Sequence, residues 1–162
     1  MKDKYTTKKQ LITELTLLRE RVTELETTNC KYRQLVEHFR ERAKELACFY
    51  AIAQIVDDPN ITLSEAFQQV AEILPSGWRY PEIARARIAI GDKQFKTLGY
   101  RETKWKLSSD IEVDGVKKGS VEVCYLEQKP EMKIEPFLSE EWLLISIVAG
   151  RLGRTIERRQ AD

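Results

Sequence analysis

The chain has 162 residues and a mass of 18.9 kDa, enough for one domain with an appendage, and its 42% hydrophobic residues can build a core. With 27 Lys and Arg against 26 Asp and Glu, the net charge of +1 gives no strong attraction to nucleic acid or to an anionic membrane. The longest nearly apolar run, 142–150, is far below the roughly 20 residues that span a bilayer, and the N-terminus lacks a signal-peptide pattern, so we expect a cytoplasmic protein with no nucleic-acid or membrane partner.

A heptad pattern fills the first third of the chain. Apolar residues recur at alternating steps of four and three from Leu11 to Ala53, and Leu15 takes position a. Asn29 also falls at an a position, which favours a parallel two-stranded coil, because two such side chains hydrogen-bond across the axis only in register. The residues predicted at the homodimer interface of this coil are Leu11, Leu15, Leu18, Val22, Leu25, Asn29, Tyr32, Val36, Phe39 and Leu46.

Charges beside this seam agree with a parallel pair. Glu14 of one chain would face Arg19 of the other, and Arg21 would face Glu26, so that both pairs attract weakly. We expect one uninterrupted helix over 8–56, which the proline that follows brings to an end.

Beyond this helix the pattern changes. A capping box at 62–65 predicts a short helix to about residue 74, and from residue 85 the apolar period becomes two, which is typical of strands. We expect strands at about 85–90, 95–100, 105–113 and 121–125. The last two would form a hairpin at Asp114-Gly115, with a loop that is either two residues long or extends through residue 118.

The last predicted element is a helix over 139–159. Its apolar residues again step by four and three, and a second stripe makes its first half apolar nearly all round, so it needs the sheet and a partner subunit to cover it. We therefore add five residues to the predicted dimer interface: Trp142, Ile145, Ala149, Leu152 and Ile156. Gly150 and Gly153 inside this helix indicate close helix packing or a hinge, and packing is the better supported reading.

The order of elements predicts an α+β fold. A long helix, a short helix, four strands and a last helix would give an antiparallel sheet on which the terminal helices pack together. We place the coiled-coil helix at 1–46 and a compact domain with its exit helix at 47–162.

Four phrases of the sequence carry a family resemblance. They are ELACFYAI at 45–52, WRYPEI at 78–83, GSVEVCYLE at 119–127 and RLGRTIER at 151–158. Over 45–159 the chain resembles the GAF-like sensor modules of bacterial and archaeal signal-transduction proteins, of the type found before PAS or histidine kinase units. The resemblance implies a dimeric, non-catalytic sensory or signal-relay domain of a two-component system, with a histidine kinase or another signalling effector as its partner.

Two features depart from that family. GAF domains that bind cyclic nucleotides, haem or bilins carry a lid segment between middle strands, whereas only about four residues, 101–104, separate the second and third predicted strands here. We therefore expect no large enclosed pocket. The chain also carries no phosphoacceptor or ATP-binding motif, so it is expected to be a fragment of a larger kinase or to act on separate partners.

One face of the predicted sheet concentrates polar residues from its first and last strands. Their charges either pair across the strands, which is common on an antiparallel sheet, or line a shallow surface with an aromatic roof. An aromatic wall with an arginine fork suits a planar anion. The candidate ligand-binding residues are Trp78, Tyr80, Arg85, Arg87, Glu122 and Cys124.

Little in the sequence indicates catalysis. Three cysteines without CxxC spacing and a single histidine, His38, predict no metal site, no cofactor and no enzyme activity. Two alternatives stay open beside the sensory domain. One is a coiled-coil oligomerisation adaptor that binds only proteins, and the other is a Cys-dependent redox enzyme or sensor that uses Cys124.

Overall fold

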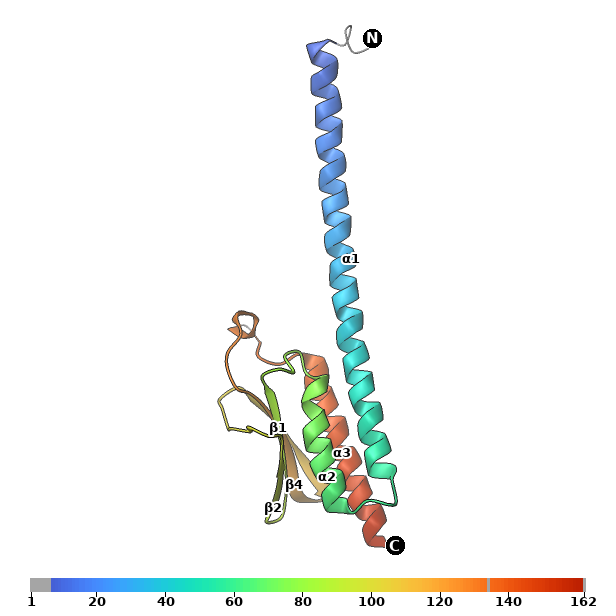
Figure 1. Ribbon diagram of the computed structural model, residues 1–162, viewed down its shortest axis with the longest axis vertical. Helices are drawn as coiled ribbons and strands as arrows, with labels where there is room; N and C mark the ends of the chain where they lie inside the picture. The colour runs from blue at the N-terminus through green and yellow to red at the C-terminus, as the bar shows by residue number, and fades with distance from the viewer. Residues whose placement is uncertain (1–6, 134, 162) are drawn as a thin grey trace. The chain divides into compact units, whose positions relative to one another are not determined.

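The computed structural model describes residues 7–133 and 135–161. Figure 1 shows a long helix followed by a compact α+β body, which confirms the predicted fold class. The elements in chain order are α1 (Lys8–Asp57), α2 (Leu63–Ile73), the 3-10 helix η2 (Leu74–Gly77), β1 (Ala84–Ile90), β2 (Lys93–Lys96), β3 (Lys106–Val113), β4 (Val116–Tyr125), the 3-10 helix η3 (Pro130–Lys133) and α3 (Ser139–Ala161).

The chain divides into two compact units between Arg40 and Glu41, earlier than the predicted boundary after residue 46. Within the second unit, α1 contacts the rest of the body: the Lys44 ammonium donates to the carbonyl of Trp78 at 3.1 Å. The body therefore includes the last turns of α1, from residue 41.

In the first unit, every described residue from 7 to 40 is exposed. The apolar residues predicted at the coil interface, including Leu46 in the body, expose between 47% and 69% of their surface. The helix itself runs as predicted, and its described residues up to Arg40 are exposed. The predicted dimer across this seam stays a prediction.

In the second unit, four antiparallel strands form one sheet in the order β2-β1-β4-β3. Helix α2 contacts β1 and β2, and α3 contacts β3 and β4, so both helices lie on the same face (Figure 1). The core lies between these layers and includes Ile52 and Val56 of α1, Ile88, Val121 and Leu152. The sheet thus has one apolar face under the helices and one outer face.

Turn chemistry sets the strand register. Asp114 and Gly115 both have positive φ, at 53° and 79°, and join β3 to β4 by a two-residue turn, the shorter of the two predicted loops. Strand β2 begins at Lys93 and ends at Lys96, so the expected strand over 95–100 is wrong from residue 97 onward. Residues 97–105 leave the sheet instead, and they form a longer connection than the four residues expected.

Helix α3 shows where the predicted interface was wrong. Ile145, Ala149, Leu152 and Ile156 are at most 5% exposed, because this stripe packs into the body's own core. Of the five predicted residues, Trp142 alone is exposed. Two further apolar residues of α3, Leu143 and Ile147, are also exposed. No helix in the described part of the chain is long and apolar enough to cross a membrane.

Gly153 explains how α3 reaches the sheet. A methyl group at this position would overlap the backbone carbonyl oxygen of Glu112 in β3, whereas at Gly150 the nearest atom to such a methyl would be 3.5 Å away. The packing interpretation is therefore confirmed for Gly153, and Gly150 has room for a side chain.

Candidate functional site

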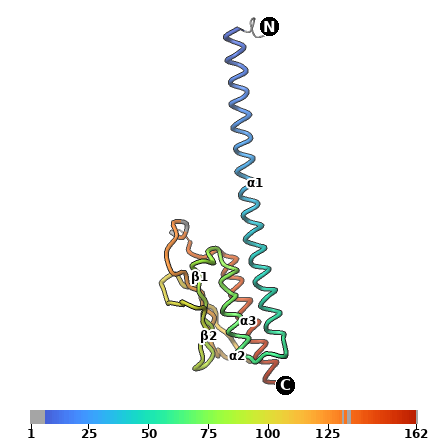
Figure 2. The backbone as a smooth tube through the Cα atoms, viewed as in Figure 1, coloured from blue at the N-terminus to red at the C-terminus, as the bar shows by residue number. Residues whose placement is uncertain are grey.

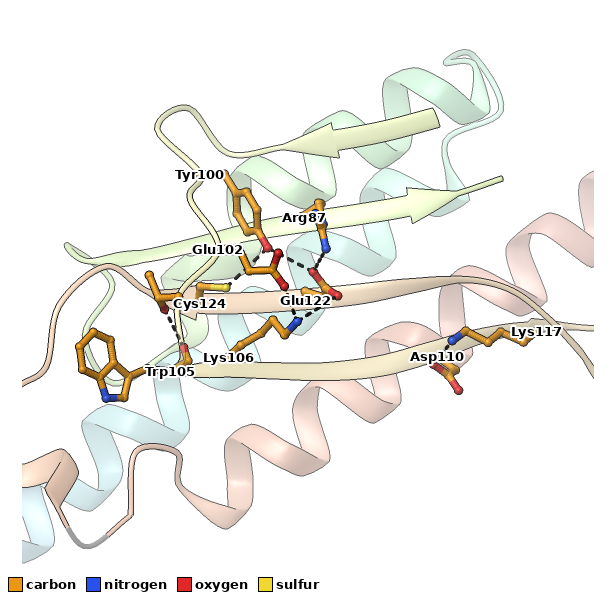
Figure 3. A network of polar contacts seen from close by, with 10 residues as sticks. Arg87, Tyr100, Glu102, Trp105, Lys106, Asp110, Lys117, Glu122 and Cys124 are labelled. Carbon is orange, nitrogen blue, oxygen red and sulfur yellow. Dashed lines mark hydrogen bonds and ion pairs between the residues drawn. The ribbon is translucent and has the colours of Figure 1, made fainter. Parts of the chain in front are cut away.

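The outer face of the sheet carries a connected polar network. Arg87 of β1 and Glu122 of β4 are register partners, so their side chains emerge side by side on this face. The guanidinium Nη2 of Arg87 donates to Oε2 of Glu122 and forms an ion pair with it (Figure 3). Of the two arrangements that the sequence left open for these charges, the structure has the cross-strand pair.

Tyr100 contacts both members of this ion pair. Its hydroxyl donates to Oε2 of Glu122 at 3.1 Å and accepts from the Cys124 thiol at 3.5 Å. The Arg87 guanidinium lies 5.2 Å from the centre of the Tyr100 ring. Burial and the hydrogen bond with Cys124 raise the pKa of Tyr100 above its ordinary value, so the phenol stays protonated and serves as a donor to Glu122.

Lys106 adds a second cation beside Glu122. Its ammonium lies 2.6 Å from Oε1 of Glu102 and 3.9 Å from Oε1 of Glu122 (Figure 3). The hydrogen bond with Glu102 raises the pKa of Lys106, and the same contact lowers the pKa of Glu102. Glu122 is thus held between Arg87 and Lys106, and its charge is compensated within the chain.

The segment 97–105 that carries Tyr100 is fixed to the sheet at several points. Arg85 Nε donates to the carbonyl of Leu98 at 3.1 Å, and Thr103 Oγ1 donates to the carbonyl of Tyr125 at 2.7 Å. Gly99 has a φ of 82°, which allows the tight turn before Tyr100. Arg85 is therefore an anchor for this segment, and it does not point a free guanidinium at a ligand.

The predicted aromatic roof is wrong. Trp78 has 0% exposure and belongs to the core, so it does not line the outer face. Tyr80 packs its ring edge-on to Tyr125, with centroids 5.5 Å apart, and the Arg79 guanidinium lies over it. Of the six candidate ligand residues, the structure brings together Arg87, Glu122 and Cys124 in the network, where Cys124 is buried.

Sequence reasoning missed Tyr100, Glu102 and Lys106. The expected strand over 95–100 includes Tyr100, although Gly99 directly before it is a turn signal. Lys106 could have been found from the two-residue period, because it lies two residues before Ser108, the register partner of Glu122.

A second polar cluster lies inside the body at the start of α3. The Glu141 carboxylate, 1% exposed, accepts from the backbone N–H groups of Leu138 at 2.6 Å and Arg79 at 2.9 Å and from the Tyr125 hydroxyl at 2.9 Å. Burial raises the pKa of Glu141, and these three hydrogen bonds act against that rise. The carboxylate thereby joins the first turn of α3 to β4 and to the segment after η2.

Neither Cys48 nor the acidic side chains outside these two clusters form a reactive or metal-binding site in the described residues. Cys48 is buried against the carbonyls of Ile73 and Leu74, and burial raises the pKa of its thiol to about 11, which disfavours the reactive thiolate. Within residues 7–133 and 135–161, no group of three or more His, Cys, Asp or Glu side chains is placed to hold a metal ion.

Comparison with known proteins bears on the fold. No protein-family model and no curated protein matches the chain. Among solved structures, it is similar to the crystal structure of an A. aeolicus nlh2 GAF domain in an inactive state, with a TM-score of 0.52. The chain has a GAF-like fold. The likeness covers 74% of this chain and 99% of that one at 15% identity, so it concerns architecture and not the residues of the outer face.

Proposed function

We propose that this chain is a dimeric, non-catalytic sensory or signal-relay domain that couples the binding of a ligand or partner to repacking of α1 against α3. A cytoplasmic location, and a histidine kinase or another signalling effector as the partner, belong to the same proposal. The GAF-like fold supports this class of function. A fold alone does not determine the function, so the proposal also needs an observation from the chain itself.

The observation that carries the proposal is the division of α1 into two faces. Within the body, Cys48, Ile52 and Val56 are buried, while Leu46 and Tyr50 on the heptad seam remain exposed. One helix thus holds the body with one face and leaves the other for a partner. A change on the partner-facing side would therefore reach the body through α1 itself.

The same helix is tied directly to α3. Asp57 at the end of α1 accepts from Arg151 at 2.7 Å and from Arg158 at 3.2 Å, and Arg158 also donates to the carbonyl of Val56. The ends of the two helices lie side by side in the backbone trace (Figure 2). A displacement of α1 along its axis would therefore pull on α3 through these ion pairs.

Coupling of this kind needs two packings of the helices. A ligand shifts their balance only by the difference between its affinities for them, which sets the upper limit of the response. A small molecule that used Arg87 and Glu122 would first have to displace Tyr100, because that ring covers their ion pair. We therefore expect modest affinity for any ligand at the outer face.

A thermal-shift screen against small molecules, with the oligomeric state measured in parallel, tests the proposal. A compound that raises the melting temperature of a dimer supports a sensor, because it binds the native state. A dimer that no small molecule stabilises favours the alternative of a coiled-coil adaptor that binds only proteins. The observation that favours this alternative is that Tyr100 covers the Arg87–Glu122 ion pair on the outer face of the sheet. A monomer at micromolar concentration contradicts both.

Thiol chemistry separates these candidates from a redox protein. Cys48 and Cys124 are buried, and only Cys30 is exposed. Labelling with a thiol reagent across pH should modify Cys30 alone in the native chain. Rapid labelling of Cys124 at neutral pH would instead support the redox alternative.

A further inference from the structure

An apolar surface remains where α1 enters the body. Leu46, at heptad position d, is 69% exposed, and Tyr50, at position a, is 65% exposed. The body packs on a different side of α1, through Cys48 and Ile52. The heptad seam therefore continues along the body without being used by it.

Helix α3 extends this surface. Its Leu143 and Ile147 are 59% and 39% exposed, and together with Leu46 and Phe49 they line an open groove of about 200 Å³ between the two helices. Glu140 is one of the charged groups that complete the lining. Leu46 thus belongs both to the seam and to the groove, so whatever covers the seam at this level also meets α3.

We propose that α1 of a second copy docks in this groove, so that the dimer interface includes Leu143 and Ile147 of α3. The inference rests on the parallel coil of the proposed function and assigns it a second contact surface. It replaces the predicted contribution of Ile145 and Ala149, which are buried in the core.

Heptad geometry identifies what the second copy would bring. In a parallel coil, a g position lies beside the e position that follows five residues later in the other chain, as in the Glu14–Arg19 pair, and Arg42 of the groove is a g residue. The second copy faces it with Ala47 at e and Ala43 at a, both exposed. Two alanines leave room for close approach, so the side chains of Leu143 and Ile147 can pack over them.

Charge and continuity favour a second copy over another apolar partner. The Glu14–Arg19 and Arg21–Glu26 pairs attract only when the same chain is repeated in parallel register, and that register aligns both copies of the groove. A closed two-fold dimer then covers both grooves at once.

Single substitutions test the groove in the full chain. Leu143→Glu and Ile147→Glu change exposed side chains, so the body should fold as before, and each should raise the dimer dissociation constant at least about tenfold in sedimentation equilibrium. Leu98→Glu is the matched control, because Leu98 is 94% exposed on the segment covering the outer face, and it should leave the constant unchanged.

The outcomes separate this inference from the proposed function. A wild-type dimer whose dissociation constant ignores both substitutions would show that the coil pairs without the groove, and the inference would fail alone. A wild-type monomer would overturn the dimer and the groove together. Weakening by Leu98→Glu to the same degree would overturn the groove, since the effect would be one of added charge.

Cross-linking gives a second measurement that does not depend on affinity. A chain with Leu143→Cys is mixed with a chain of different length with Ala47→Cys, both carrying Cys30→Ser, and the mixture is oxidised. We expect a disulfide-linked heterodimer, since Cys48 and Cys124 are buried and do not compete. If the pair Leu98→Cys and Ala47→Cys links equally well, random collision accounts for the product and the groove is not the docking site.

Discussion

Helices α1 and α3 carry apolar stripes with the same alternation of four and three residues, yet the two stripes end in opposite environments. From Leu11 to Leu46 of α1 the stripe is exposed to solvent, whereas the matching stripe of α3 is buried in the body except at Trp142. The spacing identifies an apolar face in both helices. It does not identify which surface covers that face.

The width of each apolar stripe indicates which kind of surface covers it. Along α1 the seam is narrow and is flanked by charges such as Glu14 and Arg19, which is typical of a coil that meets another helix. In α3 the stripe is widened by Leu144 and Val148, which are also buried, as expected for a helix that lies on a sheet. A wide stripe therefore points to the chain's own core and a narrow one to a partner.

The largest effect should come from a charge in the covered stripe. Ile145→Asp places a carboxylate at a site that is 1% exposed and should lower the free energy of unfolding by about 4 kcal/mol or more, because no partner for the charge is present. Chemical denaturation followed by circular dichroism measures the loss. Ser146→Asp, on the exposed side of the same helix, is the control and should change stability little. Unchanged stability for Ile145→Asp would mean that α3 is rotated about its axis.

Close approach of α3 to the sheet should give the next largest effect. Gly153→Ala should cost about 3 kcal/mol, because its methyl group would overlap the Glu112 carbonyl and backbone cannot move aside cheaply. Gly150→Ala is a matched control three residues earlier, where space is available, and should gain about 1 kcal/mol from helix propensity. A loss of stability for Gly150→Ala, with none for Gly153→Ala, would place the close approach to the sheet at Gly150.

Much of the fold follows from local patterns in the sequence. The period of the apolar residues gave the long helix to within a residue, and the Asp114-Gly115 pair located the tight hairpin, since only a left-handed backbone fits there. These features depend on neighbours in the chain, and so does the capping of α2, where Thr62 accepts from the N–H of Glu65.

The candidate site was harder to predict because it depends on chain segments that meet only after folding. The sequence put Arg87 and Glu122 on one sheet face, and strand register makes them neighbours. That Tyr100 closes the pair could not be seen, because its segment has no periodic pattern and is positioned by contacts such as Arg85 with Leu98. Trp78 was misplaced for a similar reason, since an aromatic residue in a connection fits a roof or a core equally well.

Asn29 in the seam of α1 and Glu141 in the buried face of α3 are both polar, and they should respond differently to substitution. In the buried face of α3, Glu141→Gln should cost about 2 kcal/mol, since one amide oxygen cannot accept all three donors that reach the carboxylate, including the Tyr125 hydroxyl. Because burial raises the pKa of Glu141 in the folded chain, the native state takes up this proton first, and the contribution of Glu141 to stability rises as pH falls from neutral toward 4.5.

The pH dependence of Glu141→Gln separates the charge from the hydrogen bonds. Unfolding free energies of both chains are measured by urea titration at several pH values between 7 and 5. The gain on acidification that Glu141 provides should be missing from the variant, while the similar contribution of Glu45, whose pKa is also raised by burial, remains in both chains. Parallel pH profiles would show that Glu141 is not the titrating group.

The smallest effect is expected at Asn29 in the seam of α1, and it should have the opposite sign. If a second copy covers this seam, each Asn29 side chain finds its partner in the same residue of the other chain, so its burial costs little and Asn29→Leu should stabilise the dimer by about 1 kcal/mol per chain. The same change should loosen the choice of oligomer, because leucine at position a no longer penalises other registers or a third strand.

Sedimentation equilibrium measures the mass distribution and denaturation measures the stability. Thr27→Leu, off the seam at position f, adds a similar apolar side chain and should alter neither. If Asn29→Leu leaves both quantities unchanged while Ile145→Asp unfolds the body, the exposed stripe of α1 has no partner copy, and the contrast between the two helices reflects exposure alone.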